Sequence, residues 1–158
     1  MFHIVLVEPE IPQNTGNIGR LCLAVHATLH LVGPLGFRLD EKAVRRAGLD
    51  YWKHVRYFRH PSFEALRATY PEATFRFFST KGQRCYTDVA YHPGDFLVFG
   101  RESTGLPPTL FDPAAALHIP IFGPVRSLNL ASSVAIVVYE GVRQLGGVAP
   151  ASLPWASP

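Results

Sequence analysis

The sequence predicts an α/β protein with a mostly parallel sheet and helices on both faces of that sheet. Two observations carry this prediction. Short apolar, β-branched runs alternate along the chain with longer segments whose apolar residues recur at helical spacing. Glycine or proline stands where most of these runs end, which is typical of strands that lead into loops. Alternation of this kind indicates βαβ units, in which neighbouring strands are parallel.

The elements of the first half follow from apolar spacing and from capping residues. Residues 3–7 form an apolar run that ends at Glu8, and we expect a buried strand there. Residues 17–28 are expected to be a helix, because Ile18, Cys22 and Val25 fall on one face. The same reasoning predicts a strand at 29–32, a helix at 40–47 with Asp40 as N-cap, a short strand at 55–58, and a helix from Ser62 to Tyr70.

The second half is expected to add three strands and one long helix. The predicted strands span 74–79, 96–99 and 117–121, with one helical turn at 107–111. The last helix is predicted at 128–145, and Ser127 is its expected N-cap.

That last helix is apolar or small on every side over residues 130–139, apart from two serines. A surface helix of a small domain normally carries one apolar stripe, so this helix needs cover all round. It either lies in the centre of the domain or packs against a second copy of the chain. Residues 1–145 are expected to form one domain, and residues 146–158, rich in Gly, Pro, Ala and Ser, a flexible tail.

Composition places the chain among soluble globular proteins. Of its 158 residues, 47% are hydrophobic and 17% charged, and no apolar stretch approaches the ~18 residues that span a bilayer. The N-terminal residues lack the basic start of a signal peptide, so the expected location is the cytoplasm. Cys22 and Cys85 are far apart, which favours reduced thiols over a disulfide or a zinc site. The seven histidines are scattered, and no metal is expected.

Positive charge is concentrated between Lys42 and His60. Six cationic residues stand there against one acid, Asp50, which gives +5 where the whole chain carries +3. A patch that mixes cations with aromatic rings suits phosphates and bases. The alternative interpretation is a solvated helix face followed by an edge strand. The rings among the cations are Tyr51, Trp52, His54, Tyr57 and Phe58.

Three familiar motifs are absent from the sequence. A dinucleotide-binding turn has GxGxxG after the first strand and an acid about 20 residues on. Here the first strand leads into EPEIP and the second ends in GP, without an acid. No P-loop and no GxSxG nucleophile elbow is present. A nucleotide-dependent metabolic enzyme and a serine hydrolase are therefore disfavoured.

Three glycine-bearing segments lie at the predicted strand ends. They read PEIPQNTGNIGR at 9–20, FGRESTGLP at 99–107 and IPIFGPVRSLN at 119–129. Each offers backbone groups and a few polar side chains rather than a run of charge. A sheet with three such loops at one edge can build a pocket from main chain, which suits a ligand rich in donors and acceptors, such as a nucleoside.

Polar side chains in these segments are the candidate functional residues. Arg20 lies about 200° around its helix from Ile18, at about 100° per residue, so it faces solvent or a site. Glu102 suits a general base, a salt-bridge partner or a loop cap. Neutral hydrogen bonds to ribose, amide or carboxylate groups are offered by Asn14, Ser127 and Asn129.

At these three segments, in this order and spacing, the chain resembles the SPOUT class of RNA methyltransferases. Residues 45–52 (RRAGLDYW) and 80–82 (TKG) also resemble its small TrmL (YibK-like) branch, so the resemblance covers roughly residues 1–145. It implies an α/β fold with a deep C-terminal trefoil knot, which no periodicity argument would propose. It also implies a homodimer that packs its terminal helices together. The implied methyl donor is S-adenosylmethionine, with S-adenosylhomocysteine as product.

Site residues follow from the resemblance position by position. Arg20 matches the arginine that acts on the substrate ribose, where a guanidinium stabilises developing alkoxide charge. It is assigned electrostatic activation rather than general base duty, because arginine stays protonated. The positions that match cofactor contacts are Phe78, Gly100, Ile119, Ser127 and Leu128. The positions expected at the substrate are Asn14, Arg45, Arg46, Lys81, Glu102 and Asn129.

The resemblance implies methylation of the ribose 2′-oxygen of the wobble nucleotide, a cytidine or a modified uridine, in certain leucine tRNAs. The patch at 42–60, with Lys81 and Arg84, would hold the anticodon stem-loop through its phosphates and splayed bases. The alternative is a non-catalytic RNA- or nucleotide-binding dimer on the same scaffold. Arg20 together with all three loops favours the enzyme. The sequence does not choose among tRNA isoacceptors, or between cytidine and uridine.

Overall fold

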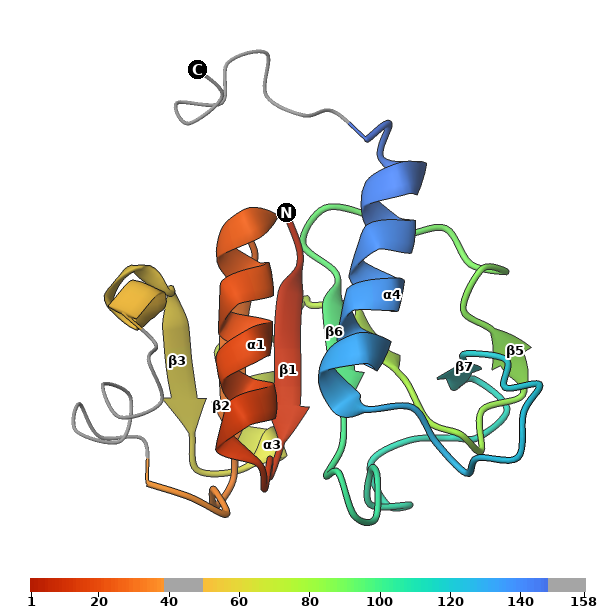
Figure 1. Cartoon of the computed structure of the whole chain (residues 1–158), viewed down its shortest axis with the longest axis horizontal. Coiled ribbons are helices and arrows are strands. Elements are labelled where there is room, and N and C mark those ends of the chain that lie inside the picture. The colour runs from red at the N-terminus through yellow and green to blue at the C-terminus, as the bar shows by residue number, and fades with distance from the viewer. Residues whose placement is uncertain (39–49, 148–158) are drawn as a thin grey trace.

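The computed structural model describes residues 1–38 and 50–147, and its centre is a five-stranded parallel sheet in the order β3-β2-β1-β6-β4 (Figure 1). A second, two-stranded parallel sheet pairs β5 with β7. The sheet strands are β1 (His3–Val7), β2 (Thr28–Val32), β3 (Tyr57–His60), β4 (Phe75–Phe77) and β6 (Phe96–Phe99), and the small sheet has β5 (Arg84–Cys85) and β7 (Leu117–His118). The helices are α1 (Pro12–Ala24), α3 (Phe63–Thr69), α4 (Leu130–Gln144) and the 3-10 helix η1 (Asp50–His54).

Helices cover both faces of the sheet, as predicted. Successive side chains of a strand point to opposite faces, and the core divides accordingly. Ile4 and Leu6 of β1 join the cluster that contains α1 and α4, while Val5 and Val7 join the cluster that contains α3. Figure 1 shows α1 and α4 side by side in front of the sheet and α3 behind it. The mostly parallel α/β architecture is thereby confirmed.

Several predicted boundaries are wrong, each for a local reason. α1 begins at Pro12, not at 17, because proline is tolerated in the first helical turn, where no amide donor is needed. β7 ends at His118 instead of 121, and Pro120 lacks the amide needed to extend its pairing. Residues 107–111 form a turn, with Leu110 N donating to Pro107 O at 3.0 Å, and not a helical segment. The predicted strands at 29–32, 55–58 and 74–79 are found at 28–32, 57–60 and 75–77.

The helix caps show one success and one error. Ser62 caps α3 as predicted, since its Oγ accepts from Ala65 N at 3.2 Å. Ser127 does not cap α4. That role belongs to Asn129, whose side-chain oxygen accepts from Ser132 N at 3.2 Å, so the helix begins at Leu130. The helix predicted at 40–47 and residues 148–158 of the predicted tail lie outside the described residues.

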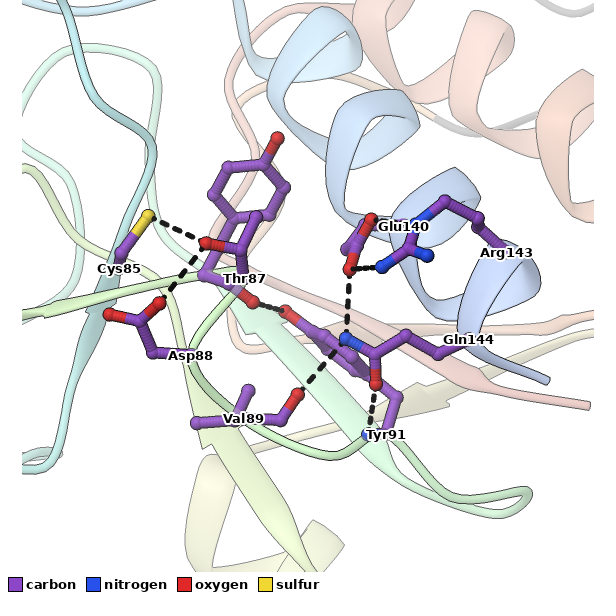
Figure 2. A network of polar contacts seen from close by, with 9 residues as sticks. Cys85, Thr87, Asp88, Val89, Tyr91, Glu140, Arg143 and Gln144 are labelled. Carbon is purple, nitrogen blue, oxygen red and sulfur yellow. Dashed lines mark hydrogen bonds and ion pairs between the residues drawn. The ribbon is translucent and has the colours of Figure 1, made fainter.

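The C-terminal half of α4 is tied to the segment that precedes β6 (Figure 2). Gln144 accepts from Tyr91 N at 3.0 Å and donates both to Val89 O at 3.1 Å and to Glu140 at 2.8 Å. Hydrogen bonds from Arg143 and Gln144 lower the pKa of Glu140 to about 2. The carboxylate is therefore charged at neutral pH and fixes the side chains around it. This network anchors the last turns of α4 to the segment that precedes β6.

Both cysteines are free thiols, as expected from their separation in sequence. Cys22 is buried in the core, and burial raises the pKa of its thiol to about 12. Within residues 1–38 and 50–147, no helix has the length and apolar character needed to cross a membrane.

Candidate functional site

The three motif segments come together where β1 and β6, which are neighbours in the sheet, end. Carboxyl ends of adjacent parallel strands lie at the same edge, so the loops that follow β1 and β6 meet there. The third segment arrives from β7 and leads into α4, which packs beside α1 (Figure 1). Side chains from all three segments are in direct contact at this edge.

Glu102 of the second loop binds the first loop through three hydrogen bonds. Its carboxylate accepts from Glu10 N at 2.8 Å, from Ile11 N at 3.2 Å and from Asn14 Nδ2 at 3.0 Å. Of the three roles open to Glu102, the structure shows a loop cap, which closes the turn before α1. Because its carboxylate already accepts from three donors of the first loop, Glu102 serves here as a hydrogen-bond acceptor within the protein.

Side chains of the first loop also bind the second loop. Glu10 accepts from Ser103 N at 3.0 Å and from Ser103 Oγ at 2.9 Å. One step earlier, Glu8 forms an ion pair with Arg101. Glu8 has a φ of 51°, in the left-handed region that a glutamate seldom adopts. Acidic side chains of the first loop and the residues of the second loop therefore hold each other in place.

Asn14 connects this pair of loops to the third segment. Asn14 is buried, and its side-chain oxygen accepts from Asn129 Nδ2 at 2.9 Å while its amide donates to Glu102. Asn129 is also the N-cap of α4. The chain Glu102–Asn14–Asn129 thus joins all three motifs, and it unites three residues that the family resemblance places at the substrate.

Gly100 is required by a close approach of backbone to backbone. A Cβ at this position would lie 2.1 Å from the carbonyl carbon of Gly105 and 2.1 Å from Leu106 N, which is impossible without displacement of the loop. Arg101 and Gly105 exchange two backbone hydrogen bonds of 3.1 and 2.9 Å that close this tight turn. Gly100 therefore shapes the second loop.

A cavity of about 380 Å³ lies beside β7. Its walls combine apolar side chains with the polar groups of Thr80, His118 and Arg126. Nδ1 of His118 is buried with no hydrogen-bond partner among the described residues. Apolar side chains beside hydrogen-bonding groups can accommodate the adenosine part of a cofactor, so the residues present are compatible with such a ligand. The cavity is lined by Thr80, His118, Ile119, Pro120, Ile121, Val125 and Arg126.

Of the five residues predicted to contact the cofactor, Ile119 alone is among those that line this cavity. Ile119 lines it, and Ser127 and Leu128 directly follow the lining residue Arg126. Phe78 is buried at the end of β4, where it bridges to Leu117 and stacks on Phe99 with ring centroids 4.8 Å apart. Gly100 follows Phe99 but does not line the cavity.

Comparisons with known proteins agree with this arrangement. The profile of the SpoU rRNA methylase family matches residues 1–139. The chain belongs to this family. A relative from Acidovorax sp. (strain JS42), named tRNA (cytidine(34)-2′-O)-methyltransferase, is 48% identical over 98% of this chain and 98% of its own length.

Two solved structures are similar as well. One, described as giving structural insights into the 2-OH methylation of C/U34 on tRNA, has a TM-score of 0.86 and 46% identity, over 94% of this chain and 98% of that chain. The other is the SpoU methyltransferase AviRb from Streptomyces viridochromogenes in complex with the cofactor AdoMet. It has a TM-score of 0.74 and 27% identity, over 92% of this chain and 61% of that chain. The resemblance drawn from the three motifs is thereby confirmed.

Arg20 lies on α1, six residues after Asn14, and its side chain is exposed, in agreement with its predicted helical position. Its guanidinium carbon lies over the ring of Tyr51, 4.6 Å from the centroid. The hydroxyl of Tyr51 donates to Gly16 O at 2.9 Å. The side chain that the family resemblance assigns to the ribose is thus supported by an aromatic ring from η1.

The basic surface is only partly the one expected. Around β3 the structure exposes Lys53, Arg56 and Arg59, and the rings of Tyr57 and Phe58 are 37% and 41% exposed. Trp52 was expected among the accessible rings, but it is buried against Gly19 of α1, where glycine leaves room for the indole. Arg45 and Arg46 lie outside the described residues. Lys81 and Arg84 are exposed, but they follow β4, at the opposite edge of the sheet from β3.

Sequence reasoning missed a row of histidines across three strands. His3 Nδ1 lies 2.8 Å from His30 Nε2, and His30 Nδ1 lies 3.0 Å from His60 Nε2. Burial, followed by the charges of its two histidine neighbours, lowers the pKa of His30 to about 3. Within the described residues no group of histidine, cysteine or acidic side chains could hold a metal ion. The signal that would have found the row is strand register, which sequence spacing alone does not show.

Proposed function

We propose that this protein transfers a methyl group from S-adenosylmethionine to the ribose 2′-oxygen of the wobble nucleotide of leucine tRNAs. The observation that carries the proposal is the joining of the three motif loops through Glu102, Asn14 and Asn129. The third of these segments also lines a pocket through Ile119 and Arg126. The name of the Acidovorax relative, which matches almost end to end, supports the same reaction and the same nucleotide.

The chain's own residues have separate roles in this reaction. When bound, S-adenosylmethionine supplies a methyl group on a positively charged sulfur. Ile119 and its neighbours would hold the adenosine part, with backbone groups of the loops as hydrogen-bond partners. Arg20 would stabilise the negative charge that develops on the 2′-oxygen and would orient the ribose. Loop contacts centred on Glu102 would keep these groups in register.

Cations and rings around β3 would bind the anticodon stem-loop. Phosphates attract Lys53, Arg56 and Arg59, while exposed rings such as Tyr57 stack on unpaired bases. Arg45, Arg46 and Lys81 would bind the same RNA. Because Lys81 lies at the other edge of the sheet, one subunit would present two separate basic areas to the RNA.

The protein would act as a cytoplasmic homodimer. Support comes from α4, where Ile136 and Tyr139 are 36% and 53% exposed although the helix is largely apolar. A second copy would cover these side chains.

A C-terminal trefoil knot within residues 1–145 is part of the same proposal. It is supported by the segment after β4 lying against β7, where Ser79 N donates to Leu117 O at 2.9 Å.

The test is methyl transfer from labelled S-adenosylmethionine to a complete tRNA pool, followed by mass mapping of the modified nucleotide. We expect one ribose methyl, at the wobble position of leucine tRNA. Arg20→Ala should abolish transfer while cofactor binding, measured by calorimetry, stays within about two-fold. Cofactor binding without transfer to any RNA would instead favour the non-catalytic RNA- or nucleotide-binding dimer.

A further inference from the structure

An exposed arginine needs support if it is to act on one oxygen atom. Arginine carries several rotatable bonds, and fixing them costs conformational entropy at the moment of reaction. Electrostatic stabilisation of a transition state is effective when the charged group is held in place beforehand. Arg20 is exposed on α1, so the question is which neighbour holds its guanidinium.

Tyr51 of η1 contacts Arg20 with its ring, and its hydroxyl is held by a hydrogen bond. The ring of Tyr51 lies under the guanidinium at 4.6 Å, within the range of a cation–π contact. The hydroxyl of the same ring donates to Gly16 O at 2.9 Å, one helical turn before Arg20. Ring and hydroxyl therefore both bind the turn of α1 that carries the arginine.

The position of η1, which carries Tyr51, is set by close packing on α1. Trp52 is buried, and a Cβ at Gly19 would lie 2.5 Å from its ring, so the indole fills the space that glycine leaves. The indole also packs against Tyr57 of β3, with ring centroids 5.4 Å apart. Tyr51 is thus carried by a short helix wedged between α1 and the sheet edge.

From this geometry we propose that Tyr51 is a positioning residue for methyl transfer, which acts by holding the Arg20 guanidinium toward the substrate ribose. The inference rests on the proposed function for the identity of the reaction. It assigns no substrate contact to Tyr51. It predicts that loss of the ring acts on the chemical step, whereas loss of an RNA-binding cation acts on tRNA binding.

Steady-state kinetics of two variants at Tyr51 separate these effects. Tyr51→Leu removes the ring and should lower kcat about 10- to 100-fold, as expected for a misplaced catalytic group, with KM for tRNA within about three-fold of wild type. Tyr51→Phe keeps the ring and should retain most of the rate. Arg59→Ala is the contrasting control and should raise KM with kcat nearly unchanged. A rise in KM alone for Tyr51→Leu would overturn the proposal in favour of base stacking by Tyr51.

A double-mutant cycle tests whether Tyr51 works through Arg20. In an Arg20→Lys background, which retains the charge but loses the planar group, Tyr51→Leu should lower the residual rate by less than three-fold. Full additivity of the two losses would contradict the proposal, because it would mean that Tyr51 acts independently of the arginine.

A measurement without RNA keeps this inference separate from the proposed function. In nuclear magnetic resonance spectra, the side-chain protons of Arg20 should be shifted upfield by the Tyr51 ring in wild type and in Tyr51→Phe. They should return toward ordinary values in Tyr51→Leu. Identical Arg20 shifts in wild type and Tyr51→Leu would overturn the proposal. Absence of methyl transfer by the wild type, with the shifts present, would count against the proposed function and leave the contact established.

Discussion

At the scale of single residues, the polar side chains of the motifs first of all hold one another. Glu102, Asn14 and Asn129 were expected at the substrate, and the structure places them in one hydrogen-bonded chain that joins three loops. Sequence reasoning found these residues because their types and motifs are distinctive. It could not assign their partners, which lie 88 and 115 positions apart along the chain.

Removal of one acceptor from this chain should loosen all three loops. Glu102→Gln keeps the size of the side chain, but it replaces one acceptor oxygen with a donor that faces backbone amides. We expect the free energy of unfolding to fall by roughly 1–3 kcal/mol, and cofactor affinity to fall with it. Urea denaturation and calorimetry measure the two effects. Glu72→Gln, an exposed control, should change stability by less than about 0.5 kcal/mol. Equal stability of the two variants would contradict the role of Glu102 as a loop cap.

At the scale of elements, periodicity identified the strands of the main sheet, α3 and α4, but placed several boundaries wrongly. The first turns of α1 were not predicted, because Pro12 and two glycines have low helix propensity. In the structure, packing of the helix on the sheet outweighs this propensity. The two-residue strand β5 gives no pattern that a sequence can show, because its pairing with β7 depends on chain segments 33 residues apart. Ser127 and Asn129 are both good caps, and only the structure distinguishes them.

Three strands also share the histidine row, and this gives a prediction for pH dependence. Burial holds the pKa of His30 near 3, while in the unfolded chain a histidine titrates near 6.5. Burial likewise lowers the pKa of His3 and of His60. Between these limits the unfolded chain binds more protons than the folded one, so stability falls as pH falls below about 6.5. Between these limits His30 contributes up to about 1.4 kcal/mol per pH unit.

Among the described residues, no group that faces His30 opposes the lowering of its pKa. The titratable and charged groups that face it are His3 on β1, His60 on β3, Arg56, and Tyr70 directly after α3, and none of them is an aspartate or glutamate. Urea unfolding at pH 7.5, 6 and 5 should therefore show a steady loss of stability that His30→Gln makes shallower. His92→Gln, at an exposed histidine, should keep the wild-type slope. The same slope in all three proteins would show that the buried row does not titrate as argued.

At the scale of the whole molecule, apolar periodicity gave the α/β class, and the three motifs gave the family. Neither gave the strand order β3-β2-β1-β6-β4, because crossovers between distant strands leave no mark in local sequence. The all-round apolar character of residues 130–139 predicts cover on every side, from the core or from a second copy. The structure covers one side with the core and leaves Ile136 and Tyr139 exposed.

Those two side chains should form part of the contact between two copies. Tyr139→Glu places a charge on this face and should convert the protein from dimer to monomer in sedimentation velocity at micromolar concentration. Ala68→Glu adds the same charge at an exposed position of α3 and should leave the dimer intact. A wild-type protein that sediments as a monomer would contradict the proposed assembly.

The most direct test of the central claim changes one oxygen atom of the RNA. Two anticodon stem-loops of leucine tRNA would be compared, one with ribose and one with 2′-deoxyribose at the wobble nucleotide, each with labelled S-adenosylmethionine. The proposed function predicts one methyl group on the ribose form and none on the deoxy form, although both should bind with similar affinity. Methyl transfer to the deoxy form would contradict it, since the acceptor would then be a base or another nucleotide.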